Sequence, residues 1–143
     1  MLATLQFLAT LCCAIFAGAA IYINAVEHPA RMSCGTSAAL AEWAPSYKRA
    51  TVMQASLAIL GVACSVAAWL AGASPRYLVA GVILGLVVPF TLVVIRPTNT
   101  RLLALDPKRD LALAETLLAR WNRLHLVRSA LSGLALVLFL WRF

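Results

Sequence analysis

The residues best suited to chemistry lie at the start of the last apolar segment, in the stretch WNRLHLVR at residues 121–128. At about 100° per residue, Trp121, Asn122 and His125 fall on one arc of a helix. Arg128 extends that arc, whereas Arg123 falls outside it. A base, an amide and a cation therefore share one face of a helix that continues into an apolar environment. Polar groups in such a place are candidate functional residues.

A second polar group closes the first apolar segment. Asn24, Glu27, His28 and Arg31 are spaced i, i+3, i+4 and i+7, which places them on one helical face. Pro29 disfavours helical geometry at the residue before it, so the helix is expected to end or kink at His28. His28 is then either part of a site or simply a cap on the helix end.

Polar residues also lie at the start of the second apolar segment and at the end of the third. Tyr47 and Gln54 share a face at the start of the second apolar segment, and Asn99 and Arg101 follow the third segment in RPTNTR at residues 96–101. Each has a simpler interpretation beside the functional one. Thr98-Asn99 after a proline is also typical of a turn, and Arg128 of the first group has a side chain long enough to reach lipid headgroups.

The composition indicates an integral membrane protein. Of 143 residues, 63% are hydrophobic and only 12% are charged, with a mean hydropathy of +0.90. Soluble domains carry about a quarter charged residues. The net charge of +7 does not indicate nucleic-acid binding, because the basic residues flank apolar blocks and form no continuous soluble face with aromatic residues between them. We interpret them as determinants of membrane topology.

The apolar blocks predict one all-α transmembrane domain over residues 1–143, an integral membrane four-helix bundle. The expected spans are approximately 2–26, 50–71, 77–96 and 121–142. A short surface helix is expected after the first span, and a cytosolic extension of the last helix is expected to begin after Asp106-Pro107. Gly81 and Gly85 predict close helix packing. No Lys or Arg precedes the first apolar run, so that run is expected to be a retained helix and not a cleaved signal.

Four spans place both termini on one side of the membrane. The loops on the other side hold most of the Lys and Arg residues, so the positive-inside rule places that side in the cytoplasm and both termini outside it. All the polar groups described above lie at this predicted cytoplasmic end. The sequence therefore predicts a polar, cationic pocket above apolar walls, which suits a flat amphiphilic molecule.

A metal site is a weighed alternative. His28, His125 and Glu27 reach the usual count of three ligands for zinc or non-haem iron. Adjacent Glu27 and His28 point about 100° apart on a helix, however, and the surroundings are cationic. Four cysteines are expected to be free thiols, because no C-x-x-C spacing appears. We expect no cofactor and no metal ligand set.

Four blocks of the chain resemble the anthrone oxygenase-like family of small membrane proteins. They are EHPAR at 27–31, WAPSYKR at 43–49, PFT at 89–91 together with RPTNTRL at 96–102, and WNRLHLVR at 121–128. The resemblance implies four transmembrane helices. It also implies oxidation of a polyketide anthrone to an anthraquinone, with molecular oxygen as the co-substrate.

The resemblance and the residues together give a hypothesis for each side chain. An anthrone readily loses a benzylic proton, and the resulting carbanion reacts with oxygen without a metal or flavin. His125 would be the base, and Asn122, Arg128 and Asn99 would stabilise the enolate and the peroxide. Trp121 would stack on the ring, and His28 would be a second base or a proton relay. The remaining expected substrate contacts are Tyr47, Gln54, Asn24 and Arg101.

Two other classes of function compete with this hypothesis. The first is a non-enzymatic membrane bundle that binds a lipophile, a quinone or a membrane partner through the same polar end. The second is a transporter, which needs broken helices and polar residues near the bilayer midplane. Only Pro89 points that way. The expected partners are thus the lipid bilayer and a small hydrophobic aromatic molecule, and the sequence does not indicate an oligomeric state.

Overall fold

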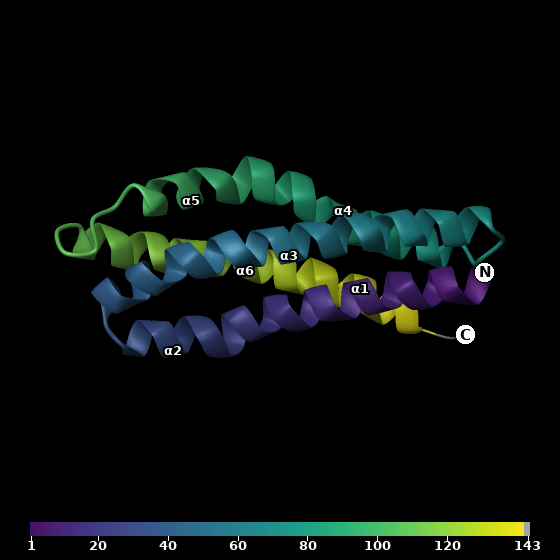
Figure 1. Cartoon of the computed structure of the whole chain (residues 1–143), viewed down its shortest axis with the longest axis horizontal. Coiled ribbons are helices and arrows are strands. Elements are labelled where there is room, and N and C mark those ends of the chain that lie inside the picture. The colour runs from purple at the N-terminus through teal and green to yellow at the C-terminus, as the bar shows by residue number, and fades with distance from the viewer. Residues whose placement is uncertain (142–143) are drawn as a thin grey trace.

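The computed structural model describes residues 1–141, and every element over that range is helical. The described helices join into four long rods. Figure 1 shows the rods packed side by side, with the first and the last described residues at the same end of the bundle. The elements are α1 (Leu2–Tyr22), the π-helix η1 (Ile23–Glu27), α2 (His28–Ser33), α3 (Thr36–Leu70), α4 (Arg76–Phe90), the π-helix η2 (Thr91–Ile95), α5 (Arg96–Leu103) and α6 (Leu111–Leu140). The predicted all-α four-helix class is confirmed.

Each rod is apolar enough and long enough to cross a membrane. The four candidate spans within the described chain are Leu2–Ser33, Thr36–Leu70, Arg76–Leu103 and Leu111–Leu140. At 1.5 Å per residue, the longest one, with 35 residues, rises about 50 Å, against about 30 Å of hydrocarbon. Part of the bundle therefore extends beyond the hydrocarbon. The chain is a multi-pass membrane protein, and its helices are longer than the predicted spans.

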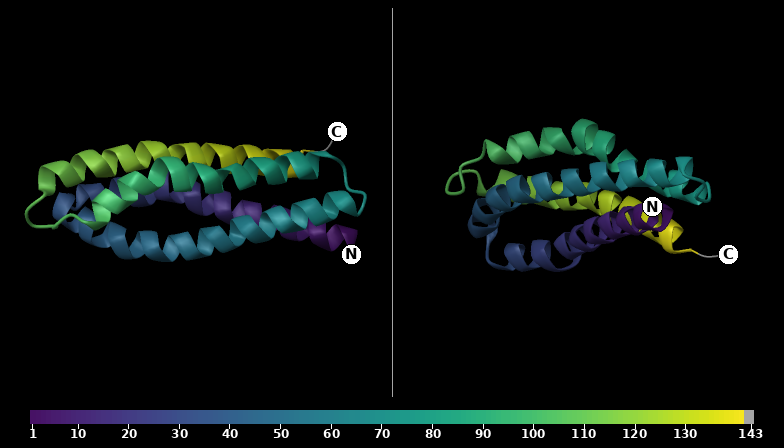
Figure 2. Two further views of the ribbon diagram at one scale, coloured as in Figure 1. Left: turned by 90° about the horizontal axis from the view of Figure 1, so that it is seen from above. Right: turned by 45° about the vertical axis from the view of Figure 1, so that its right-hand side comes forward.

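The segment that follows the first span differs from the expectation. The short surface helix predicted there is not a separate element, because α3 begins at Thr36 and continues through Pro45 to Leu70. Gly35, at φ 90°, makes the turn between α2 and α3. Pro45 lies on the exposed side of α3, and the helix bends around its ring without breaking. Figure 2 shows α3 as a bowed helix.

The start of the last helix was also predicted wrongly. Asp106 does not cap it, because α6 begins at Leu111 with Asp110 at the N-cap position. The Asp106 carboxylate accepts a hydrogen bond from the Lys108 backbone N–H at 2.8 Å, and the Asp110 carboxylate accepts one from the Asp106 N–H at 2.9 Å. These two local bonds stabilise a turn in place of the first helical turn.

Both π-helices end just before an X-Pro pair. η1 is followed by His28-Pro29 and η2 by Arg96-Pro97. A proline donates no backbone hydrogen bond and its ring clashes with the carbonyl four residues earlier, so a wider turn relieves the helix there. The first rod thus neither ends nor breaks at His28 but widens and continues. Short π-segments of this kind occur frequently at functional sites.

The end of the bundle that holds both termini, called the terminal end below, is packed through small residues. Leu84 and Cys12 lie close to the Cα of Gly61, and Ser65 lies against Gly81. The Ser65 hydroxyl also donates a hydrogen bond to the Tyr77 backbone carbonyl. The close packing predicted for Gly81 is therefore observed, and it joins α3 to α4.

Candidate functional site

The candidate site lies at the opposite end of the bundle, called the polar end below, where α2 meets α3 and α5 meets α6 (Figure 1). His125 of α6 is its most enclosed polar side chain, with 1% of its surface exposed. The His125 Nδ1 atom lies 2.9 Å from the Oδ1 atom of Asn24, which the η1 turn presents to α6. Asn24 therefore links the first and the last rods at the imidazole.

The hydrogen bonds of Asn24 fix the tautomer of His125. The Asn24 Nδ2 group donates to the backbone carbonyl of Asn122 at 3.0 Å and to its Oδ1 at 2.7 Å, and Ser129 Oγ donates to Asn24 Oδ1 at 2.6 Å. The oxygen of the amide thus faces the imidazole, so Nδ1 must carry the hydrogen. The lone pair of the neutral ring then lies on Nε2. This arrangement suits a general base.

An aromatic wall lies beside the imidazole. The Trp121 ring packs against His125 with 4.9 Å between centroids and against His28 on another side with 6.0 Å. Trp43 meets Trp121 edge to face at 5.8 Å and stacks on Tyr47 at 5.0 Å, with 3° between the planes. The predicted Trp121 is thus at the site, and Trp43 packs against its far side. The indole lies against both histidines.

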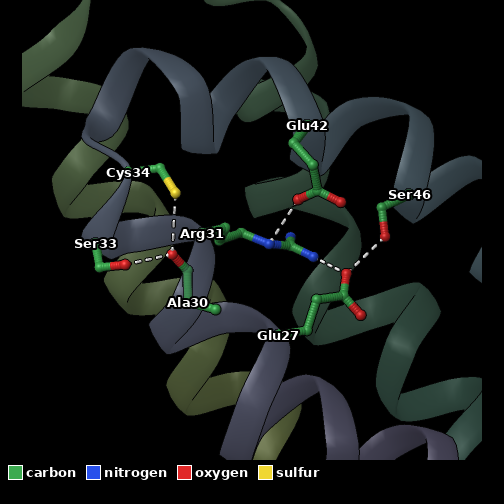
Figure 3. A network of polar contacts seen from close by, with 7 residues as sticks. All are labelled: Glu27, Ala30, Arg31, Ser33, Cys34, Glu42 and Ser46. Atoms are coloured by element: carbon green, nitrogen blue, oxygen red, sulfur yellow. Dashed lines mark hydrogen bonds and ion pairs between the residues drawn. The ribbon is translucent and has the colours of Figure 1, made fainter.

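An ion-pair network around the buried Arg31 side chain holds the first rod to α3. The Arg31 guanidinium pairs with Glu27 on its own rod, and its Nε lies 2.8 Å from Glu42 Oε2. Ser46 Oγ donates to the same Glu27 carboxylate at 2.8 Å, as Figure 3 shows. The helices on the two sides of the Gly35 turn are therefore joined by one ion pair, Arg31 to Glu42, and one charge-assisted hydrogen bond, Ser46 to Glu27. Glu27 and Arg31 share this network, whereas Asn24 turns toward α6.

Arg128 and Gln54 form a second polar link, between α6 and α3. The Arg128 Nη2 group donates to Gln54 Oε1, and the guanidinium carbon lies 5.5 Å from the centroid of the Phe16 ring. Within the described chain, two donor atoms of this pair are buried without a hydrogen-bond partner, Arg128 Nε and Gln54 Nε2. An unpaired buried donor costs free energy, so a ligand or water that accepts from this pair would be stabilised here.

The side chains enclose a small cavity of about 20 Å³, which is room for about one water molecule. Its lining includes charged groups from the ion-pair network and several of the predicted site residues: Trp121, His125, Arg128, Tyr47 and Gln54. The cavity is too small for a ring system as it stands. It suits a water, a proton acceptor or a diatomic molecule beside His125.

The structure separates the other predicted residues from this cavity. Asn122 contacts Asn24 and thereby acts on His125 only indirectly. His28 is buried against Trp121 and is absent from the described lining of the cavity. Asn99 is buried in the helix α5, so the alternative that Thr98-Asn99 forms a turn is wrong. Arg101 is exposed on the same helix and lies outside that lining.

Two participants were given no role from the sequence. Ser129 donates to Asn24, and Ser46 donates to Glu27 in the ion-pair network beside the cavity. Ser129 follows His125 by four residues and shares its helical face, so its spacing held a usable signal. Ser46 had no such signal, because its role depends on how α3 packs against the first rod.

The side chains at the polar end do not form a metal site within the described residues. Among residues 1–141, no group of three His, Cys, Asp or Glu side chains lies close enough together to hold a metal ion. Glu27 is engaged by Arg31 and Ser46, and His125 by Asn24. The weighed set of His28, His125 and Glu27 is therefore not assembled in this structure.

Comparison with known families gives a match over most of the site. The family model described as anthrone oxygenase matches residues 43–138, about two thirds of the chain. Neither the curated proteins nor the solved structures include a match to this chain. The matched range contains the Trp43, Gln54, His125 and Arg128 side chains of the site, whereas Asn24 and the η1 turn precede it.

Proposed function

The chain belongs to the anthrone oxygenase family, and from this premise we propose that it oxidises a flat, phenolic anthrone-type substrate to a quinone with molecular oxygen. The observation that carries the proposal is the bond between His125 Nδ1 and Asn24 Oδ1, which leaves Nε2 as the basic atom of a side chain that lines a small cavity. A positioned base is the main requirement for this reaction.

The reaction balances without an external reductant. A base removes one proton from the benzylic carbon, and the carbanion, delocalised as an enolate, transfers electrons to oxygen and forms a C–O bond to a peroxide. The protonated base returns its proton to the distal peroxide oxygen. Removal of the second proton from the same carbon then forms the C=O bond as the O–O bond breaks. One oxygen atom enters the quinone and the other leaves as water.

We assign both proton removals to His125. Each step needs the same lone pair on Nε2, and the amide of Asn24 holds the ring in one tautomer throughout the cycle. Asn122 and Ser129 are positioning residues, because they bind Asn24 and not the cavity. In this proposal the base contributes about 10² to 10⁴ in rate.

Arg128 is the cation assigned to the oxyanions. It borders the same cavity as His125 and is fixed by Gln54 and the Phe16 ring. A preorganised cation beside a developing enolate or peroxide lowers the barrier, because it needs no reorganisation during the reaction. Trp121 supplies a flat apolar surface next to the base. Since all electrons come from the substrate, the proposed reaction uses no metal and no flavin.

The test is oxygen uptake by the full chain in lipid nanodiscs, with 1,8-dihydroxyanthrone as the probe. The wild-type protein is expected to consume one oxygen molecule per quinone formed and to exceed the rate of spontaneous oxidation. Chelator is expected to leave the rate unchanged. An uptake no faster than that of empty nanodiscs would overturn the proposal in favour of a binding protein. Loss on chelation with recovery on added iron or copper would instead replace the base mechanism by a metal-dependent one.

A further inference from the structure

A second cavity lies on the other side of the Arg128–Gln54 pair. It is a slot of about 120 Å³ between α3 and the junction of α4 with η2. Arg128, Gln54 and Thr51 border both this slot and the small cavity at His125. The pair therefore separates a small polar cavity from a larger apolar one.

The slot runs from the lipid-facing surface to the core. Its outer walls include Ala55, Val88 and Leu92, which are exposed on the surface of the bundle. Its inner walls include Ala58 and Val87, which are almost completely buried. In Figure 1, α4 packs along α3, and the chain then diverges from α3 as it passes through η2 into α5. An apolar molecule dissolved in the bilayer would meet the outer walls first.

The polar side chains of Gln54 and Arg128 lie at the inner end of this apolar slot. Gln54 is 2% exposed, and its Nε2 atom has no hydrogen-bond partner in the described chain, as is also true of Arg128 Nε. Both side chains border the slot, and each has a buried N–H donor that lacks an acceptor, so a small rotation of either side chain would offer that donor to an oxygen on an otherwise apolar molecule. A phenolate or quinone oxygen meets both requirements, whereas a simple hydrocarbon leaves both donors unpaired.

We propose that this slot binds one oxygen-bearing ring of a planar phenol or quinone that enters sideways from the bilayer, with its oxygen accepting hydrogen bonds from Gln54 and Arg128. At about 120 Å³ the slot is smaller than the usual 300–1,000 Å³ of ligand pockets. It therefore takes one ring, and the rest of the molecule lies between α3 and η2 toward the lipid. The identity of the ligand as a substrate rests on the proposed function, but its binding does not.

The test measures equilibrium binding of 1,8-dihydroxyanthraquinone to the full chain in nanodiscs, by the shift of the visible absorption band. Ala55→Trp and Val88→Trp fill the slot from opposite walls, and each is expected to weaken binding at least tenfold. Ala63→Trp is the matched control, because Ala63 is exposed on the same helix and is not part of the described slot lining. It is expected to bind like the wild type.

Gln54→Glu separates ligand binding from a structural role. The new carboxylate still pairs with Arg128, yet it offers no N–H donor and repels a phenolate. Binding is expected to weaken at least tenfold, while the midpoint of thermal unfolding stays within a few degrees. Anthracene, which has no oxygen, is expected to bind the wild type and Gln54→Glu equally and weakly.

The outcomes are distinct from those of the oxygen-uptake test. Equal quinone affinity in Ala55→Trp, Val88→Trp and Ala63→Trp would overturn the slot as the binding site, whether or not the protein oxidises anthrones. Unchanged affinity in Gln54→Glu would overturn the polar anchor. Tenfold losses in a protein that shows no oxygen uptake would support the slot and reject the oxygenase.

Discussion

The two ends of the bundle use the same four rods in different ways. At the terminal end, Gly61, Gly81 and Ser65 let α3 pack closely against its neighbours, and the open hollow of about 710 Å³ there lies on the surface. At the polar end, Asn24 and His125 are joined by a hydrogen bond, and the small cavity and the apolar slot reach the buried Arg128–Gln54 pair. Helix packing at the terminal end depends on glycines, which have no side chain. Helix packing at the polar end depends on hydrogen bonds between large polar side chains.

This difference between the two ends indicates which residues stabilise the fold and which position the candidate site. Close contact of small residues supplies dispersion energy, which drives helix association when lipid removes the hydrophobic difference. Buried polar groups add less, since each must first lose its solvation. The network of Glu27, Arg31 and Glu42 and the link of Asn24 to His125 thus contribute geometry more than stability. Substitutions at the two ends should therefore change different measured quantities.

The largest expected effect is at the base. His125→Gln keeps a side chain of similar size with a hydrogen-bond donor but removes the basic nitrogen, so the anthrone oxidation rate is expected to fall about 10² to 10⁴-fold. Thermal unfolding in nanodiscs should change little. His28→Gln is the comparison variant, and because Trp121 lies against both rings we expect a loss below tenfold. Equal losses in the two variants would restore His28 as a proton relay.

The next effect tests the tautomer. Asn24→Leu removes the acceptor for His125 Nδ1, so either nitrogen then holds the hydrogen and the rate is expected to fall about 10²-fold, at the lower end of the range for a lost base. Asn24→Asp restores an acceptor and is expected to recover most of the rate lost in Asn24→Leu. The order of the three oxidation rates is the measurement, and a rate for Asn24→Asp below that of Asn24→Leu would contradict the assignment.

At the terminal end the expected effect is on stability. A methyl group at Gly81 meets the Ser65 side chain, so Gly81→Ala is expected to cost about 1–3 kcal/mol of unfolding free energy through overpacking. The oxidation rate per folded molecule should stay within twofold of the wild type. Ser65→Gly in the same chain removes the clash and should return most of the stability. A large loss of turnover in folded Gly81→Ala would mean that the two ends are coupled.

The smallest effect is expected for Ser65→Ala. This change removes the hydrogen bond from the Ser65 hydroxyl to the Tyr77 carbonyl, and interhelical hydrogen bonds in membranes contribute about 0.6 kcal/mol on average. The midpoint of unfolding should shift by a few degrees at most, with no change in quinone binding. A shift larger than that of Gly81→Ala would show that this bond, and not the small residues, holds the terminal end together.

The terminal end was the more predictable of the two. Apolar blocks and the spacing of Gly81 and Gly85 require only composition and period, and these predicted the four rods and their close packing. The predicted placement of the polar end in the cytoplasm stays a prediction, because the structure carries no membrane. The helix bounds were less predictable, since Pro45 bends a helix without ending it and Asp106 uses its carboxylate in a turn.

At the polar end, the sequence predicted which segments meet but not which atoms. Trp121, His125, Arg128, Tyr47 and Gln54 lie together at the cavity, as the shared helical faces and the topology predicted. The atomic contacts of Asn24 and Asn122 were not predicted, because Asn24 bonds the imidazole and Asn122 in turn bonds Asn24. The position of Asn24 depends on the π-turn η1, which a regular helical period of 3.6 residues does not predict.

The π-turn η1 also has a consequence for how this site can change. A π-turn is an α-helix with one extra residue, and its wider turn absorbs that residue, so removing a single residue from 23–27 would restore a regular helix and leave the residues beyond it nearly in place. The ion pair of Arg31 with Glu42 would then remain, whereas the turn that presents Asn24 to α6 would be lost. A deletion of one residue here would thus remove the hydrogen bond to His125 and leave the membrane protein.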